Sequence, residues 1–179
     1  GNNGDYFNGC FNLNLENVTD ILNLSGTTNL NYMFSECNSL TTVNNINSWD
    51  VSNVITMEAM FVSSNFNQSL SNWDVSNVQN MISMFNGSPN FNQDLGHWNV
   101  SGVTNMSYML DGTSLSRTNY NSLLTGWTGW IGGVPTKSVQ SNVPFSVGTT
   151  QYSSGTTAND ARNYLVTGKT WTITDGGGI

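Results

Sequence analysis

Charged residues are scarce in this sequence: they make up 8% of its 179 residues, against roughly 25% in an ordinary soluble domain. Basic residues are the rarest, and all four lie after residue 116: Arg117, Lys137, Arg162 and Lys169. Nine of the eleven acidic residues lie before that point, so the first two thirds of the chain carry a charge of −9. A surface of that sign repels nucleic acid and anionic lipid headgroups, which excludes nucleic acid as a partner.

Long hydrophobic runs are also missing. No apolar run approaches the ~20 residues that a membrane-spanning helix needs, so direct membrane insertion is not expected. There is no signal peptide. The chain begins Gly1-Asn-Asn-Gly and ends Gly-Gly-Gly-Ile179, which is typical of a piece of a longer protein. The missing targeting signals therefore say nothing about location.

Catalytic motifs are missing as well. His97 is the single histidine, and Asp94 lies three residues before it, but no Gly-x-Ser-x-Gly elbow accompanies them. One histidine and two distant cysteines do not supply a zinc site. Asp50 and Asp74 are a possible carboxylate pair for glycoside hydrolysis, but a flat open face lacks a cleft for it. We therefore expect that the protein is not an enzyme.

The sequence does contain four segments that are similar to one another. Val51-Ser-Asn-Val-Ile-Thr-Met-Glu-Ala-Met-Phe61 and Val75-Ser-Asn-Val-Gln-Asn-Met-Ile-Ser-Met-Phe85 are the clearest pair, and versions of them start at residues 24 and 100. The spacings are 27, 24 and 25 residues. A period of that size predicts a solenoid in which each repeat buries its apolar face against the next.

Each repeat combines two hydrophobic periods. Trp73 and Val75 alternate as in a short strand, and Met81, Met84 and Phe85 follow at helical spacing. The predicted fold class is thus an α/β repeat: a leucine-rich-repeat-like right-handed solenoid of short parallel strands and short helices, closed by a C-terminal α+β cap. The repeated large residues should form two buried core columns, one of Trp49, Trp73 and Trp98 and one of Met33, Met60, Met84 and Met109.

Two cysteines mark a degenerate repeat at the N-terminus. Cys10 and Cys37 are 27 residues apart, as are Leu22 and Trp49. Residues 1–23 are therefore interpreted as a degenerate N-terminal repeat before the repeats of residues 24–116. Neighbouring strands lie ~4.8 Å apart, within the Cα range of a disulfide. Both a Cys10–Cys37 disulfide and two buried free thiols fit this spacing.

Polar residues recur at the outward positions beside the buried valines. They are Asp50, Ser52, Asp74, Ser76, Asn99 and Ser101. Asp50 and Asp74 should lie about one strand spacing apart, where their like charges repel. A Ca²⁺ ion, which prefers oxygen ligands, would relieve this repulsion by binding between them. The alternative is that each aspartate accepts hydrogen bonds from nearby backbone N–H groups. With His97, these positions are the candidate ligand-binding residues.

The repeat pattern stops after Leu110, and residues 117–179 are predicted to cap the stack. A short helix is expected over 120–127, a brief strand over 143–147, a second helix from about Ala158 to Val166 with Thr157 as its N-cap, and an edge strand over 171–174. Trp127 and Trp130 either plug the end of the core or stack on a sugar ring.

The repeats resemble the BspA-type leucine-rich repeats of bacterial surface proteins, a family that includes Mycoplasma lipoproteins and surface antigens. The motifs that carry the resemblance are Asn72-Trp-Asp-Val-Ser-Asn-Val78, Phe91-Asn-Gln-Asp-Leu95 and Asn105-Met-Ser-Tyr-Met109. Two further motifs lie in the C-terminal part, Ala161-Arg-Asn-Tyr-Leu165 and Trp171-Thr-Ile-Thr-Asp-Gly-Gly177. The resemblance covers residues 24–179. It implies attachment at surfaces and brings no catalytic residue.

These observations favour a non-enzymatic extracellular recognition or adhesion module that binds a glycan or a protein through its repeat surface. The alternative is a structural subunit or tip domain of a surface appendage or a phage or viral fibre, associating with itself through the N-terminal edge. Either would lie outside the cell, on a cell or virion surface. No cofactor is expected apart from Ca²⁺ at Asp50 and Asp74.

Overall fold

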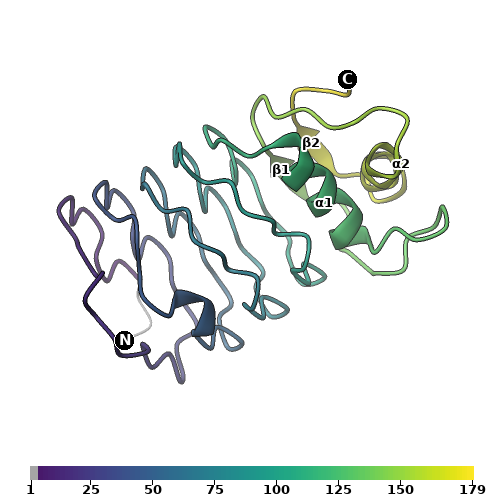
Figure 1. The fold of residues 1–179 in the computed structure, drawn as a ribbon. Coiled ribbons are helices and arrows are strands. Elements are labelled where there is room, and N and C mark those ends of the chain that lie inside the picture. Colours follow the sequence, from purple (N-terminus) through teal and green to yellow (C-terminus); the bar gives the residue numbers. More distant parts are fainter. Residues whose placement is uncertain (1–3) are drawn as a thin grey trace.

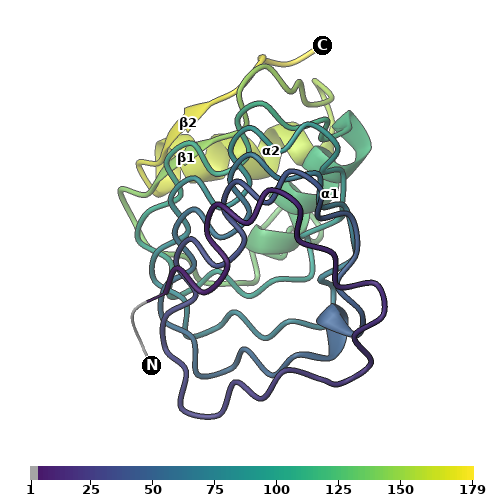
Figure 2. The same ribbon diagram turned by 90° about the vertical axis from the view of Figure 1, so that its left-hand side faces the viewer.

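A computed structural model describes residues 4–179, in which the chain passes through a stack of similar turns and then enters a helical segment (Figure 1). We call each pass a rung. Rung 1 spans residues 5–23, rung 2 spans 24–50, rung 3 spans 51–74, rung 4 spans 75–99 and rung 5 spans 100–116. Seen along the stack, successive rungs overlie one another (Figure 2). Residues 117–179, the C-terminal segment, lie at the end opposite to rung 1.

Backbone hydrogen bonds join each rung to the next at alternate residues. In rung 3, the N–H groups of Met57, Ala59, Phe61 and Ser63 donate to the carbonyls of Asn80, Ile82, Met84 and Asn86 at 2.8–2.9 Å. Rung 2 donates to rung 3, and rung 4 to rung 5, with the same alternation. Isolated parallel bridges connect one position of four rungs, namely Asn29, Thr56, Asn80 and Asn105. The rungs are therefore held together by a continuous parallel set of backbone bonds.

The intervening amides close local turns instead of a helix. Met84 N–H donates to Met81 O and Asn86 N–H donates to Ser83 O, both three residues back. Ser83 has a left-handed φ of 54°, and the matching Tyr32, Ala59 and Tyr108 have φ between 53° and 58°. A left-handed residue in every rung interrupts a right-handed helical path.

The structure thus differs from the strand and helical turn predicted in each repeat. Within residues 4–116, the sole helical element is a 3-10 turn, η1 (Ile46–Ser48), and no strand is formed: the rungs are joined by isolated bridges and by the alternating backbone bonds. The inter-rung bonds lie where the helical turn was expected: Met81 N–H donates to the next rung, whereas Met84 N–H closes a local turn on Met81 O.

The core runs through the centre of the stack. Met33, Met60, Met84 and Met109 are all buried, as are Trp49, Trp73 and Trp98. Trp49 and Trp73 stack with ring centroids 6.4 Å apart. The core also contains a third column, made of phenylalanines, which was not predicted. Successive ring centroids in it lie 5.5–5.6 Å apart, and its members are Phe7, Phe34, Phe61 and Phe85.

Indole N–H groups link the rungs as well. Trp73 Nε1 donates to Ile46 O at 2.8 Å, and Trp98 Nε1 donates to Leu70 O at 3.0 Å. Trp127 of the C-terminal segment continues the series by donating to Leu95 O at 2.8 Å. Each of these bonds satisfies a buried donor with a carbonyl of an earlier rung.

The C-terminal segment contains the helices α1 (Arg117–Thr128) and α2 (Thr157–Asn163), a π-helical turn η2 (Tyr164–Gly168), and the strands β1 (Pro144–Ser146) and β2 (Thr172–Thr174). The two strands pair in parallel, with Phe145 opposite Ile173. Strand β1 also extends the stack, because Met106 and Leu110 N–H groups donate to Pro144 and Ser146 carbonyls at 2.9 and 3.0 Å. The segment therefore covers rung 5.

Both helices were expected, but their starts differ from the prediction. Helix α1 begins three residues earlier, because the Ser116 side chain caps it by accepting from Asn119 N–H at 3.2 Å. Helix α2 is capped by Thr156 and not by Thr157. The Thr156 hydroxyl donates to Ser153 O at 2.7 Å and makes no bond to the helix N-terminus.

A buried ion pair fixes the C-terminal segment. Arg162 Nε lies 2.6 Å from Asp175 Oδ2, and that carboxylate also accepts the Tyr120 hydroxyl at 2.7 Å. The Arg162 guanidinium lies over the Tyr152 ring at 5.0 Å. Burial, followed by the nearby Asp175 charge, raises the pKa of Tyr120 well above its ordinary value. Helices α1 and α2 and the last residues are thus tied to one carboxylate.

The two cysteines are free thiols in the structure. Cys10 is exposed and Cys37 is fully buried, with its Sγ donating to Phe7 O at 3.1 Å. The disulfide alternative is therefore not formed, and only one of the two thiols is buried. Burial raises the pKa of the Cys37 thiol to about 11.

Candidate functional site

The outward polar positions form a repeated turn. Asp50 Oδ1 accepts from Ser52 N–H at 3.1 Å and from the Ser52 hydroxyl at 2.6 Å. The next rungs repeat the backbone bond, from Ser76 to Asp74 at 3.0 Å and from Ser101 to Asn99 at 3.2 Å. We call these six residues the polar column. Each Asp or Asn supports its own turn, as short polar side chains do at such positions.

These local bonds occupy part of the proposed calcium ligands. Hydrogen bonds from the Ser52 side chain and backbone hold the pKa of Asp50 below its ordinary value, so the carboxylate is charged without a metal. In the described part of the chain, no three Asp, Glu, His or Cys side chains gather as a metal site. Calcium at Asp50 and Asp74 stays a prediction, and it would need backbone or water oxygens as further ligands.

A hollow surface lies where the polar column meets the C-terminal segment. It has two adjoining parts of about 370 and 520 Å³, and His97 and Lys137 line both. The smaller part is lined by Trp130 and the start of the loop after α1, and the larger part by Asn99 and Ser101. We call this surface the C-terminal groove and define it by His97, Asn99, Ser101, Trp130 and Lys137.

Its position follows from two glycines. A Cβ atom on Gly126 of α1 would lie 2.2 Å from Gly96 O, so the helix backbone packs directly on rung 4. Helix α1 ends at Gly129, which has a left-handed φ of 60° and accepts the Thr136 hydroxyl at 2.6 Å. The chain then turns out into residues 130–138, which form the second wall of the groove.

Both signs of charge are present at the groove. His97 is exposed, and its Nε2 lies 4.0 Å from Asp94 Oδ2. Lys137 Nζ donates to Gly126 O at 2.7 Å, which holds the ammonium group at the wall. Asp94 also accepts Ser122 Oγ at 2.9 Å.

The connections among these groups are not those of a hydrolytic triad. In a triad the histidine lies between the acid and the nucleophile, whereas here Asp94 lies between His97 and Ser122. The arrangement offers hydrogen-bond donors and a cation to a ligand. It does not activate the serine.

Trp130 contributes a buried indole N–H at this end of the stack. From the sequence, its side chain was expected either to plug the core or to stack on a sugar ring. Its Nε1 is buried without a hydrogen-bond partner among the described residues, and its ring lies 6.0 Å from Tyr164. Trp127, by contrast, is fully buried and bonded. Lys137 was missed altogether, because it lies 36 residues beyond Ser101 in a Gly- and Ser-rich loop without a repeat.

The structure brings some predicted residues together and separates others. His97, Asn99 and Ser101 line the C-terminal groove, whereas Asp50, Ser52, Asp74 and Ser76 lie on earlier turns of the polar column and line none of the groove. Within residues 4–179, no helix is long and apolar enough to cross a membrane.

Comparison with known protein families gives a match over most of the chain. The sequence model of a family described as "Mycoplasma protein of unknown function, DUF285" matches residues 4–128, which covers all five rungs and α1. No curated protein matches the sequence. No solved structure matches it either.

Proposed function

Because this chain belongs to the DUF285 family of Mycoplasma proteins of unknown function, we propose a function from its own geometry: a non-enzymatic extracellular recognition module of the BspA-type leucine-rich-repeat class. It binds a glycan through the C-terminal groove, on a cell or virion surface. The repeats that carry the resemblance supply the stack, and the stack holds the groove residues in place.

The observation that carries this proposal is the composition of the groove. Asn99, Ser101 and Ser138 offer hydroxyl and amide groups, and Lys137 offers a cation on a chain of net charge −7. Trp130 contributes an aromatic side chain to the lining of the adjoining hollow. Oxygen-rich ligands such as sugars match a wall of donors beside an aromatic ring.

A glycan array probed with the whole chain tests the proposal. Binding should require the groove and should fall at least tenfold in His97→Ala/Lys137→Ala, since both side chains line both hollows. Arg117→Ala is the matched control, because it removes an exposed positive charge outside the groove. Arrays run with Ca²⁺ and with a chelator show whether Asp50 and Asp74 contribute a calcium site.

Two outcomes would contradict the proposal. One is binding that the double variant leaves unchanged, and the other is the absence of binding to every glycan in either condition. Binding only to a protein array would move the ligand from the glycan to the protein class and keep the recognition role.

A structural role is the second candidate, and exposed apolar side chains at the rung 1 end favour it. Phe11 and Ile21 are each 56% exposed and Tyr6 is 42% exposed. Exposed apolar surface at one end of a stack suits contact with another subunit. If the chain is a subunit or tip of a fibre, sedimentation should show association that Phe11→Ser/Ile21→Ser abolishes. A monomer at all concentrations would contradict it.

A further inference from the structure

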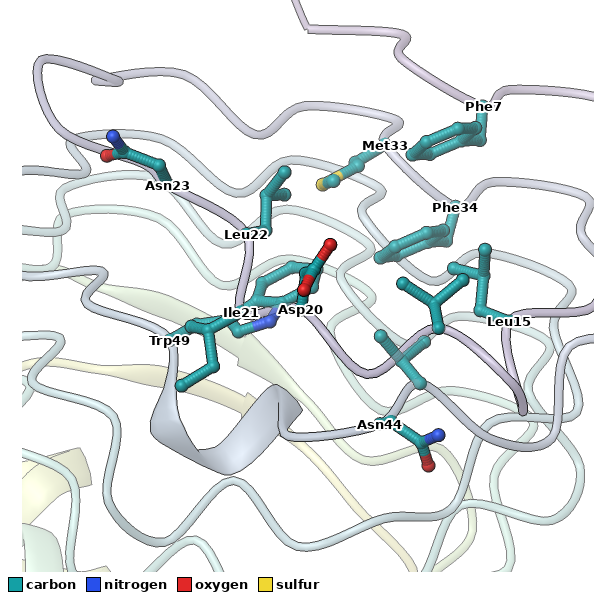
Figure 3. Close-up of a pocket in the computed structure, with 12 residues that line it drawn as sticks. Phe7, Leu15, Asp20, Ile21, Leu22, Asn23, Met33, Phe34, Asn44 and Trp49 are labelled. Carbon is teal, nitrogen blue, oxygen red and sulfur yellow. The ribbon is translucent and has the colours of Figure 1, made fainter.

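A second hollow lies at the opposite end of the stack, between rungs 1 and 2 (Figure 3). Its volume is about 220 Å³ and its walls are almost entirely apolar. We call it the N-terminal pocket and define it by Phe7, Leu22, Met33, Phe34, Val43 and Trp49. It shares no residue with the C-terminal groove.

The pocket exists because rung 1 lacks a tryptophan. Leu22 stands 27 residues before Trp49, where the following rungs carry indoles. Trp73 stacks on Trp49 at 6.4 Å with an interplanar angle of 14°. Trp49 meets the pocket on its rung 1 side, where Leu22 provides no ring. The missing indole leaves room for a planar group that would extend the column.

A buried donor at the pocket is also unsatisfied. Trp73 and Trp98 each donate their indole N–H to the preceding rung, but Trp49 Nε1 is buried without a partner among residues 4–179. The carbonyl of Thr19, at the corresponding place in rung 1, instead accepts Asn45 Nδ2 at 3.0 Å. A buried N–H without a partner costs free energy that a ligand oxygen would recover.

The outer wall of the pocket is exposed to solvent. Val18, Ile21 and Leu22 line the pocket from outside and are 40–56% exposed. Side-chain amides attach this segment to rung 2, with Asn44 Nδ2 donating to Glu16 O and Asn45 Nδ2 to Thr19 O. Because Trp49 Nε1 is buried, a ligand reaches it only if this wall moves, and the inter-rung bonds of residues 5–9 are not part of the wall.

Charge limits the class of ligand. Asp20 is the charged residue that lines the pocket, and every lysine and arginine of the chain lies after residue 116. An anionic group would meet a carboxylate without a compensating cation. An apolar cavity of about 150 Å³ accepts a benzene ring, so a pocket of 220 Å³ accommodates one substituted ring.

We propose that the N-terminal pocket binds an uncharged single aromatic ring that carries a hydrogen-bond acceptor, with the ring in the apolar space between Leu22 and Phe34, beside Trp49, and the acceptor on Trp49 Nε1. The chemical class is that of an aromatic amide or ketone. This site is independent of the proposed glycan groove, and either can fail without the other.

Benzamide and benzoate are suitable probes, because they share a shape and differ in charge. Titration of the whole chain, followed by the indole N–H signals in ¹H–¹⁵N NMR spectra, should shift the Trp49 signal with benzamide at millimolar concentration. The dissociation constant of benzoate should be at least tenfold higher than that of benzamide. In Asp20→Asn the two dissociation constants should lie closer together, because the carboxylate that repels benzoate is gone.

Leu22→Trp is the blocking variant, because it supplies the ring that later rungs carry. It should abolish the benzamide shift, whereas Ile131→Trp, which adds an indole at a 69% exposed position of the other end, should leave it unchanged. Trp49→Phe assigns the signal. The proposal is overturned if benzamide leaves the Trp49 signal in place, if all six indole signals move together, or if Leu22→Trp binds as well as the original chain.

Discussion

At the scale of single residues, the tryptophans show what one repeated side chain contributes. Trp73, Trp98 and Trp127 each bury a ring and each donate to a carbonyl of an earlier rung. Trp49 buries its ring in the same way but leaves its N–H unpaired. The four positions therefore separate the effect of the hydrogen bond from that of packing.

Trp73→Phe should lower the free energy of unfolding by about 0.5–1.5 kcal/mol more than Trp49→Phe. Both changes remove similar apolar area, but only the first removes an indole hydrogen bond, that from Trp73 Nε1 to Ile46 O, which keeps its bond from Trp49 N–H. Urea denaturation of both variants measures the difference. Equal losses would mean that the indole bonds contribute nothing beyond ring burial.

The cysteines give a second residue-scale prediction. Exposed Cys10 should react with a thiol reagent at once, and buried Cys37 only when the protein unfolds. The native protein should therefore consume one equivalent of the reagent per chain at neutral pH. A Cys10–Cys37 disulfide would give no reaction until a reductant is added, which would contradict the structure.

The raised pKa of Cys37 adds a pH dependence. A group whose pKa is higher in the folded state stabilises that state below its unfolded pKa, here about 8.5. This contribution is lost as pH rises through about 11. Cys37→Ala should therefore lose less stability than the original chain between about pH 9 and pH 11, measured by denaturant titration.

At the scale of elements, the close contact between α1 and rung 4 decides where the groove lies. Gly126→Ala would raise helix propensity by about 1 kcal/mol, but its Cβ atom would lie 2.2 Å from Gly96 O. The clash involves backbone on both sides, so we expect a net loss of about 2–3 kcal/mol. Thr118→Ala, at an exposed position of the same helix, should change stability by less than about 0.5 kcal/mol.

Thermal unfolding of the two helix variants checks this expectation. A Gly126→Ala protein as stable as Thr118→Ala would show that α1 does not rest on Gly96. The groove would then lack the contact that fixes α1, and with it Lys137, which is bonded to Gly126 O.

Which elements were predictable depends on whether a pattern repeats. The methionine equivalent to Met84 recurs in rungs 2–5 and the tryptophan equivalent to Trp73 recurs in rungs 2–4, and the structure buries them all. The local backbone was not predictable from the same pattern, because Ser83 and Tyr108 adopt left-handed φ although neither residue type favours it. Tertiary bonds to the next rung impose that conformation.

The candidate site divides along the same line. His97, Asn99 and Ser101 were found because they flank repeated core positions. Lys137 and Trp130 were not assigned to the groove, because their approach depends on the Gly96–Gly126 contact and on the turn at Gly129. A repeat pattern cannot predict these contacts, because α1 and the loop after it occur only once in the sequence.

At the scale of the whole molecule, the C-terminal segment should stabilise the entire stack. Asp175→Ala should lower the free energy of unfolding by about 3 kcal/mol, since it leaves buried Arg162 unpaired and removes the acceptor of Tyr120. Asp160→Ala is the matched control, with the same charge change at an exposed site, and should cost less than about 1 kcal/mol. Equal costs would mean that this ion pair does not hold the segment in place.

The central claim is that every rung rests on the preceding one through the same contacts, and NMR cross-relaxation from the indole N–H protons tests it most directly. The structure predicts cross-peaks from Trp73 to residues around Ile46, from Trp98 to those around Leu70, and from Trp127 to those around Leu95. Cross-peaks from these indoles to unrelated parts of the chain would contradict the stack and, with it, both proposed binding surfaces.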